Sequence, residues 1–162
     1  MRNALATLVA LCLPPLLAAA PDREEAAKGK KVKYERYNGY FEKNSSGLTG
    51  GSSYLVFTNR DAFDKVFGVA RVIGKQKFLP KDALEKQMVV TVIKRGSTLW
   101  KYNVEKVTED DDTLYIQYEA TGEESKTAKY KSPLIVAVDK GKYKKVIFIE
   151  NGKKVSTLDI EK

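Results

Sequence analysis

Short apolar segments separated by turn residues constrain the fold of this chain more than any other feature of its sequence. Near the C-terminal end, Val146–Ile149 is followed by Asn151-Gly152 and by a further strand-like segment over Lys153–Leu158. An Asn-Gly pair between two such segments is the strongest short-range signal for a β-hairpin, because both residues accept the positive φ angles of a tight turn. The end of the chain therefore predicts two strands joined by a hairpin.

More segments of strand length lie upstream. Met88–Ile93 and Leu134–Val138 are continuously apolar, which is typical of strands covered on both faces. Apolar and polar residues alternate over Trp100–Glu105 and Leu114–Glu119, which predicts strands with one face in water. Two further strands are expected at Val32–Phe41, which is rich in aromatic residues, and at Tyr54–Phe57.

One clear helix is predicted over Asn59–Phe67, ending at Gly68. Thr58 is expected to cap it, with Asp61 bonding back in a capping box. Polar loops are expected at 43–53 and 121–129, and a short helical turn after Pro80. The fold class is α+β, mainly β: an antiparallel sheet or small sandwich of roughly six to eight strands with one helix packed on it.

Residues 1–20 have the pattern of a secretory signal peptide. Arg2 supplies a positive start, Ala4–Leu17 is apolar and uncharged, and Ala18–Ala20 supplies the small residues found at cleavage sites. Pro14-Pro15 interrupts the apolar segment, which disfavours a permanent transmembrane helix and leaves an uncleaved anchor as the alternative. We expect a flexible basic linker over 21–31, a single β-rich domain over 32–162, and a secreted or periplasmic location.

The chain contains no histidine, and its one cysteine, Cys12, lies inside the predicted signal peptide. Triad hydrolases and most zinc and copper sites need imidazole, and thiolate chemistry needs a cysteine in the mature chain. We therefore predict no enzyme, no catalytic, cofactor-binding or metal-binding residue, and no cofactor. Weaker alternatives are calcium at Glu109–Asp112, where the spacing favours a solvated turn, a Ser125-Lys126 dyad, and a distant carboxylate pair.

Basic residues outnumber acidic ones, 29 to 21, for a formal net charge of +8. A candidate patch for an anionic partner lies near the end of the chain around Tyr143, and consists of Lys140, Lys142, Lys144, Lys145, Lys153 and Lys154. Such a patch would bind nucleic acid or an acidic envelope polymer. The other interpretation is that lysines at turns and edge strands prevent aggregation of sheets.

The aromatic residues of the first strand form a second candidate surface, for which packing onto the core is the alternative. These residues are Tyr34, Tyr37, Tyr40 and Phe41. Asn44-Ser45-Ser46 also matches a glycosylation sequon, which matters in a eukaryotic host.

Three segments carry a family resemblance: Val56-Phe57-Thr58-Asn59 before the predicted helix, Lys86–Val92, and Ser132–Val136. They resemble the C-terminal domain of PrcB-type subunits, which are exported accessory proteins of bacterial surface protease complexes. The resemblance covers about two thirds of the chain. Where that family often has Pro-Thr-Gly-Gly-Tyr, this chain has Arg95–Trp100. The resemblance implies a protease-partner role and transfers no functional residue.

Two function hypotheses follow. The first is an exported, non-catalytic domain that binds or stabilises another exported protein, such as a member of a secreted protease complex. The second is electrostatic binding of an anionic polymer through the lysine-rich hairpin.

Overall fold

The computed structural model describes residues 28–70 and 74–160 and shows a mainly β fold with two stacked sheets. The predicted signal peptide and most of the predicted linker lie outside the described residues. Sheet A contains, in spatial order, β1 (Lys30–Lys31), β7 (Thr98–Asp110), β8 (Thr113–Glu124), β10 (Lys145–Glu150) and β11 (Lys153–Asp159). Sheet B contains β2 (Tyr34–Tyr37), β9 (Tyr130–Asp139), β6 (Gln87–Gly96) and β4 (Ser52–Phe57).

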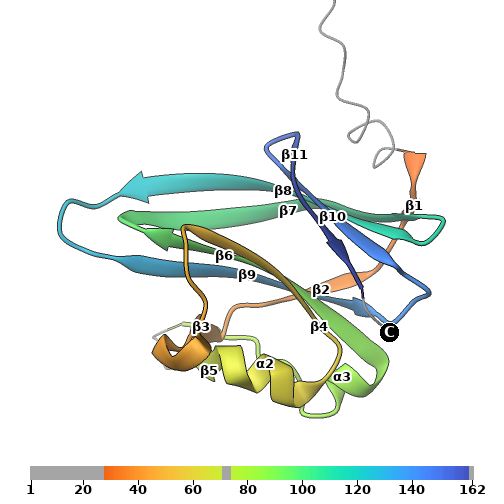
Figure 1. Ribbon diagram of the computed structural model, residues 1–162, viewed down its shortest axis with the longest axis horizontal. Coiled ribbons are helices and arrows are strands. Elements are labelled where there is room, and N and C mark those ends of the chain that lie inside the picture. The colour runs from red at the N-terminus through yellow and green to blue at the C-terminus, as the bar shows by residue number, and fades with distance from the viewer. Residues whose placement is uncertain (1–27, 71–73, 161–162) are drawn as a thin grey trace, which may run out of the picture.

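A third layer covers the face of sheet B that points away from sheet A (Figure 1). It contains the helices α2 (Arg60–Val66) and α3 (Ala83–Lys86), the 3-10 turn η1 (Asn44–Ser46), and a small sheet of β3 (Tyr40–Glu42) and β5 (Phe67–Val69). We call it the outer layer. The predicted α+β, mainly β fold is confirmed, in the form of a sandwich with a helical layer on one side.

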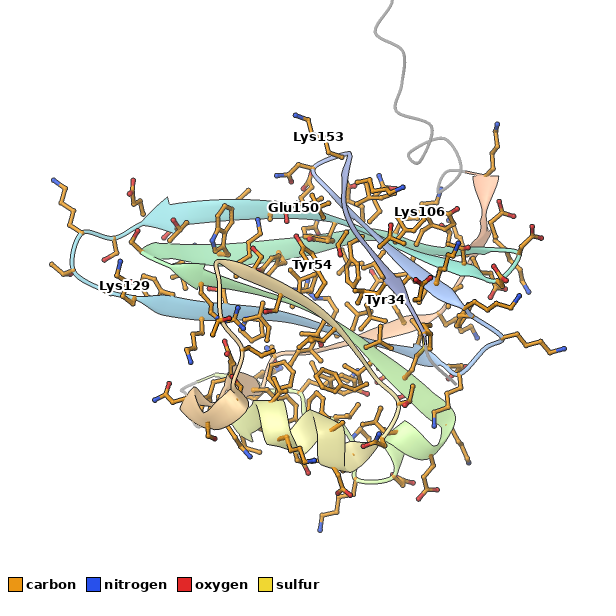
Figure 2. The ribbon with its side chains drawn as sticks, in the orientation of Figure 1. Tyr34, Tyr54, Lys106, Lys129, Glu150 and Lys153 are labelled. Atoms are coloured by element: carbon orange, nitrogen blue, oxygen red, sulfur yellow. The ribbon has the colours of Figure 1, made fainter. Side chains whose placement is uncertain are left out.

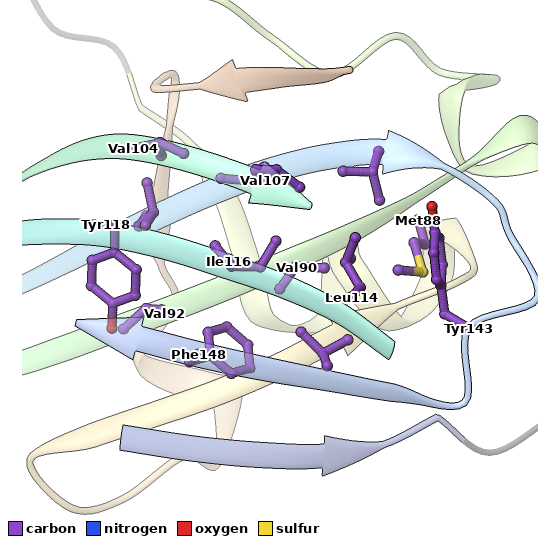
Figure 3. Close-up of a cluster of buried hydrophobic side chains, with 14 of the residues drawn as sticks. Met88, Val90, Val92, Val104, Val107, Leu114, Ile116, Tyr118, Tyr143 and Phe148 are labelled. Atoms are coloured by element: carbon purple, nitrogen blue, oxygen red, sulfur yellow. The ribbon is translucent and has the colours of Figure 1, made fainter. Parts of the chain in front are cut away.

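Strand β6 shows why the sequence folds into three layers. Its alternate residues Met88, Val90 and Val92 belong to the core between the two sheets, which Figure 3 shows together with Leu114, Ile116 and Phe148. Val89 and Ile93 belong to the core under the outer layer. All five side chains are at most 3% exposed, so the continuous apolar run is explained by burial on both faces of the strand.

The C-terminal hairpin is confirmed. Asn151 and Gly152 have φ angles of 50° and 75° between β10 and β11, as a tight primed turn requires. One pairing differs from a purely antiparallel sheet: β10 lies parallel to β8, with Lys145 opposite Thr113. The chain crosses to sheet B as β9 between these two strands, so β10 returns to sheet A in the direction of β8.

The single strand expected over Val32–Phe41 is wrong. The chain bends at Asn38-Gly39, so that β2 joins sheet B and β3 pairs with β5. The Asn38 side chain holds the bend: its Oδ1 accepts from the backbone N–H of Lys77 at 2.7 Å, and its amide donates to the carbonyl of Lys75 at 3.3 Å. The aromatic composition predicted β structure but not this change of sheet.

The helix is confirmed, but its predicted cap is wrong. α2 begins at Arg60, and the Oδ1 of Asn59, not the hydroxyl of Thr58, accepts from the backbone N–H of Ala62 at 2.9 Å. Asparagine is at least as good an N-cap as threonine, and the observed cap lies one position after the predicted one. Phe63 is buried on the helix, and Phe67 is buried as the first residue of β5.

Two loop boundaries also differ from the expectation. β8 continues to Glu124, which shortens the predicted loop over 121–129 to 125–129. Lys30 and Lys31, placed in the linker by the sequence, pair with Thr108 and Glu109 of β7. Among the described residues, no helix has the length and apolar character that a membrane span requires.

Candidate functional site

The small sheet of the outer layer carries an exposed phenylalanine ring over a glycine. Phe41 on β3 lies directly opposite Gly68 on β5. A Cβ atom at Gly68 would lie 2.7 Å from the Phe41 ring, so the ring occupies the space that a side chain at this position would need. Directly opposite residues of an antiparallel pair point to the same face, which places Phe41 on the outside of the small sheet.

A second ring lies over a glycine at the start of the small sheet. The backbone N–H of Ala70 donates to the carbonyl of Gly39 at 2.8 Å, next to the β3–β5 pairs. A Cβ atom at Gly39 would lie 2.2 Å from the Phe78 ring. Gly39 lies at the bend that precedes β3, and the Phe78 ring also meets the Tyr40 ring with centroids 5.9 Å apart. The rings of Phe41 and Phe78 therefore each occupy the space over a glycine, one on β5 and one at the bend before β3.

These rings remain open to solvent. Phe41 is 47% exposed and Phe78 is 42% exposed. Val69 on β5 is 54% exposed, but it lies opposite Tyr40 and therefore points to the other face of the small sheet. Six large apolar side chains of the described residues are exposed in total, so half of them lie on or next to this small sheet. A gathering of exposed apolar side chains is typical of an interaction surface, whereas single scattered ones need no explanation.

The opposite face of the small sheet is anchored in the core. Tyr40 and Phe67 pack around Phe63 with ring centroids 5.1 and 4.9 Å from it. The carboxylate of Glu42 is fully buried and accepts from the Nε of Arg95 and from the hydroxyl of Ser46, each at 2.7 Å. A buried charge that is paired and hydrogen-bonded in this way fixes the position of β3.

A cationic hollow lies next to Phe78. It has a volume of about 360 Å³ and is lined by Arg36, Asn38, Lys75, Gln76 and Lys77. The backbone N–H groups of Asn38 and Gly39 both donate to the carbonyl of Lys77, which places the hollow beside Phe78. Its lining contains three cationic side chains and no carboxylate.

Two of these cations are available to an anion. Lys77 pairs with Glu35 at 3.0 Å and lies over the Tyr37 ring, 5.4 Å from its centroid. The hydrogen bond from Tyr37 and then the ammonium of Lys77 hold the pKa of Glu35 below its usual value. Within the described residues, Arg36 and Lys75 form no ion pair. We call Phe41, Phe78, Arg36, Lys75 and Lys77 the aromatic–cationic face.

The six lysines of the predicted patch are all exposed, but the structure does not bring them together. One group surrounds the turn between β9 and β10, and the other begins β11. Lys145 lies opposite Asp159 and Lys153 lies opposite Glu150, so the six-residue strand β10 separates the groups by about 17 Å. Figure 2 shows Lys153 at the tip of the β10–β11 hairpin. The first group consists of Lys140, Lys142, Lys144 and Lys145, and the second consists of Lys153 and Lys154. Within the first group, Lys144 pairs with Asp112 at 2.6 Å.

The acidic turn and the serine–lysine pair have structural partners. Glu109 accepts from the Tyr143 hydroxyl at 2.8 Å, and the hydroxyl oxygen of Ser125 accepts from the backbone N–H groups of Thr127 and Ala128. The described residues contain no group of three or more His, Cys, Asp or Glu residues placed to hold a metal ion.

A second polar cluster lies between the two sheets. Lys94 on β6 pairs with Glu150 on β10, and the hydroxyl of Tyr118 donates to the other oxygen of Glu150 at 2.9 Å. The Lys94 ammonium lies 3.8 Å from the centroid of the Trp100 ring. Figure 2 shows Tyr54 close to Glu150. Glu150 is paired with a cation, as Glu42 is in the outer layer. Because Lys94 lies on sheet B and Glu150 on sheet A, the geometry suits a structural link between the two sheets.

The sequence found part of the aromatic–cationic face. Of the four aromatic residues proposed as a surface, Tyr37 and Tyr40 are buried, whereas Tyr34 and Phe41 are exposed. Phe78 and Lys75 were missed, because they lie in a segment without periodicity. Their positions depend on contacts with Gly39 and Asn38, which are far away in the sequence. The signal that the sequence did offer was a glycine next to an aromatic residue.

Comparison of the whole chain with protein-family models, curated proteins and solved structures gave no match. The fold and the site together define the class of this protein: a β-sandwich with an outer layer that displays aromatic and cationic side chains.

Proposed function

We propose that this chain is an exported, non-catalytic domain that binds another protein through its aromatic–cationic face. One observation carries the proposal: two phenylalanine rings lie open to solvent over glycines, and one of them, Phe78, adjoins a hollow with three cations and no carboxylate. Aromatic side chains and arginine are the residues that protein interfaces favour at their energetic centres.

The partner surface is acidic and carries an apolar side chain that packs on the rings. The positive charge of the hollow and the formal net charge of +8 both attract an acidic surface. A non-catalytic role is supported by the absence of histidine from the chain and by the cationic partners of Glu42 and Glu150. The resemblance to PrcB-type accessory subunits and the signal-peptide pattern support an exported partner, such as a secreted protease.

The test is differential capture from the envelope fraction of the native host. We expect the wild-type chain to retain a partner that the Phe41→Ser/Phe78→Ser variant loses, because those rings supply the buried apolar contact. Val155→Ser is the matched control, since Val155 is 41% exposed on β11, away from the small sheet. Equal retention of the same proteins by all three chains, or substrate turnover by the purified chain, would contradict the proposal.

The cationic half of the face is tested by charge removal. We expect Arg36→Gln/Lys75→Gln to weaken capture and to reduce its salt dependence, whereas Lys140→Gln/Lys142→Gln leaves it unchanged. A loss that is equal for the two double variants would indicate attraction by net charge alone.

The second candidate function is binding of an anionic polymer at the β9–β10 turn. It is favoured by Lys140 and Lys142, which are exposed and form no ion pair within the described residues. Salt-dependent binding of a polyanion that falls when Lys140, Lys142, Lys144 and Lys145 are changed to glutamine would support it. Binding that survives this change would exclude the turn as the site.

A further inference from the structure

The edge strands of the structure differ in how well they are protected. An unpaired edge invites another strand, and natural proteins block it with charged residues, bulges or short length. β11 carries Lys153, Lys154 and Asp159 and a register shift opposite β10. β2 carries Glu35 and Arg36, β1 consists of Lys30 and Lys31, and β5 is uncharged but only three residues long.

β4 has none of these protections. Its sequence from Ser52 to Phe57 contains no charged residue and no proline, and the nearest charges along the chain are Lys43 and Arg60. Its pairing with β6 is regular over all six residues. Tyr54 and Val56 are half-buried, whereas β6 beside them is buried. β4 is thus a six-residue edge of a sheet with nothing on it to repel a strand.

The backbone groups that β4 offers can be identified. The N–H of Arg95 donates to the carbonyl of Gly51 at 2.8 Å, and Gly51 lies opposite Arg95 in the extended register. In an antiparallel ladder, hydrogen-bonded pairs alternate with unbonded ones. The backbone N–H and C=O groups of Ser52, Tyr54 and Val56 therefore point away from β6, toward the open edge.

A groove follows the same edge. It has a volume of about 330 Å³ and is lined by Tyr54–Val56 and Thr58 on one side and by Leu158–Ile160 on the other, so that its lining is mostly apolar and contains one carboxylate, Asp159. Figure 1 shows β4 and β11 as the strands that approach each other on this side of the sandwich. A strand added to β4 would find unpaired backbone groups beside it and apolar side chains next to them.

We infer that the occupant of this edge is the β4 strand of a second copy of the chain. Two copies of β4 paired antiparallel about a two-fold axis at Tyr54 place Tyr54 opposite Tyr54 and Ser52 opposite Val56. Each pair joins two sets of outward backbone groups, and because β4 is uncharged, no like charges meet in the seam. This symmetric pairing makes the two sheets B one continuous sheet across the dimer.

Proline substitution separates this pairing from the fold. The N–H of Val56 points outward, so Val56→Pro removes a donor from the seam and no bond to β6. The matched control is Thr157→Pro on β11. Since the N–H of Ile160 donates to the carbonyl of Lys144 at 2.7 Å, alternation along that ladder leaves the N–H of Thr157 pointing outward as well.

The measurement is sedimentation of the chain as purified from its host, over a range of concentrations. We expect a dimer for the wild type and for Thr157→Pro, and a dissociation constant at least about tenfold higher for Val56→Pro, with circular dichroism unchanged. Ser52→Pro, at the exposed first position of β4, repeats the test should Val56→Pro not fold. A monomeric wild type, or a dimer that persists in both β4 variants, would overturn the inference. Neither result bears on the aromatic–cationic face.

Discussion

The core between the two sheets and the core under the outer layer are built differently. The first is mainly aliphatic, with Met88, Val90, Leu114 and Ile116 interdigitating between strands. The second is built around aromatic rings: those of Tyr40, Phe57 and Phe67 have centroids 5.1, 5.5 and 4.9 Å from that of Phe63. The aliphatic core is enclosed by two sheets, whereas the aromatic one reaches the surface at Phe78, whose ring meets that of Tyr40 at 5.9 Å. Phe41 lies open on the outer face of the small sheet.

This difference assigns stability and binding to different layers. Rings that meet edge to face contribute both buried area and specific geometry. The outer layer needs such rings because its sheet is small and its longest helix has seven residues. Two further rings, those of Phe41 and Phe78, lie exposed outside this core, and we propose that they bind the partner. Four changes would break or sharpen the comparison.

The largest effect is expected at the centre of the aromatic core. Phe63→Ala should lower the free energy of unfolding by about 4 kcal/mol, because the side chain is fully buried among other rings. Phe148→Ala, in the sandwich core, should cost about 3 kcal/mol, since Phe148 packs in a mainly aliphatic cluster and meets the Tyr54 ring at 5.0 Å. Chemical denaturation of both variants checks the order, and a larger loss for Phe148→Ala would contradict it.

The two buried ion pairs should differ in the same direction. Glu42→Gln should cost about 3 kcal/mol, because it leaves Arg95 without its charge partner beside a fully buried position. Glu150→Gln should cost about 1 kcal/mol, since the side chains of Lys94 and Glu150 are 11% and 14% exposed and water can partly replace the pair. Denaturation midpoints measured at equal ionic strength provide the comparison. Equal losses would show that burial does not separate the two pairs.

Raising the pH above 10 should destabilise the sandwich core progressively. Burial, followed by the charge of Glu150, raises the pKa of Tyr118 well above its usual value of 10.0. An acid whose pKa is raised by folding contributes stability that is fully present below pH 10 and is lost as the pH rises beyond it. Phenolate absorbance should therefore show Tyr118 ionising only with unfolding. The check is a titration of Tyr118→Phe, which should lose no early-titrating phenol; loss of one would contradict the account.

The smallest effect on stability is expected at Gly68. Gly68→Ala puts a methyl group 2.7 Å from the Phe41 ring, which is half exposed and able to move outward. The free energy of unfolding should fall by about 1 kcal/mol or less, while the altered ring position should weaken capture of the partner. Thermal denaturation and capture, run side by side, check both parts. A large loss of stability would mean that the ring belongs to the core.

The sandwich could be predicted from the sequence because its signals are local. The continuous apolar run over Met88–Ile93 and the Asn151-Gly152 turn each fixed a strand without reference to distant residues. The parallel pairing of β8 with β10 could not be predicted, because it depends on the path of the chain through the other sheet.

The outer layer could not be predicted for the same physical reason. Its decisive contacts join residues far apart in the sequence, such as Phe78 over Gly39 and Arg95 against Glu42. The lysines predicted to form one patch are close together in the sequence. They lie at the two ends of β10, however, and the length of that strand keeps the two groups apart. Sequence proximity was therefore a poor guide to a shared surface.

The account depends most on the claim that Phe41 and Phe78 bind the partner and do not hold the fold. The most direct measurement is the affinity of the captured partner for the wild-type chain and for Phe41→Ser/Phe78→Ser, together with their unfolding midpoints. We predict an affinity loss of about thirtyfold or more, as for a central aromatic contact, with nearly unchanged unfolding. Unchanged affinity in a folded variant would contradict the claim.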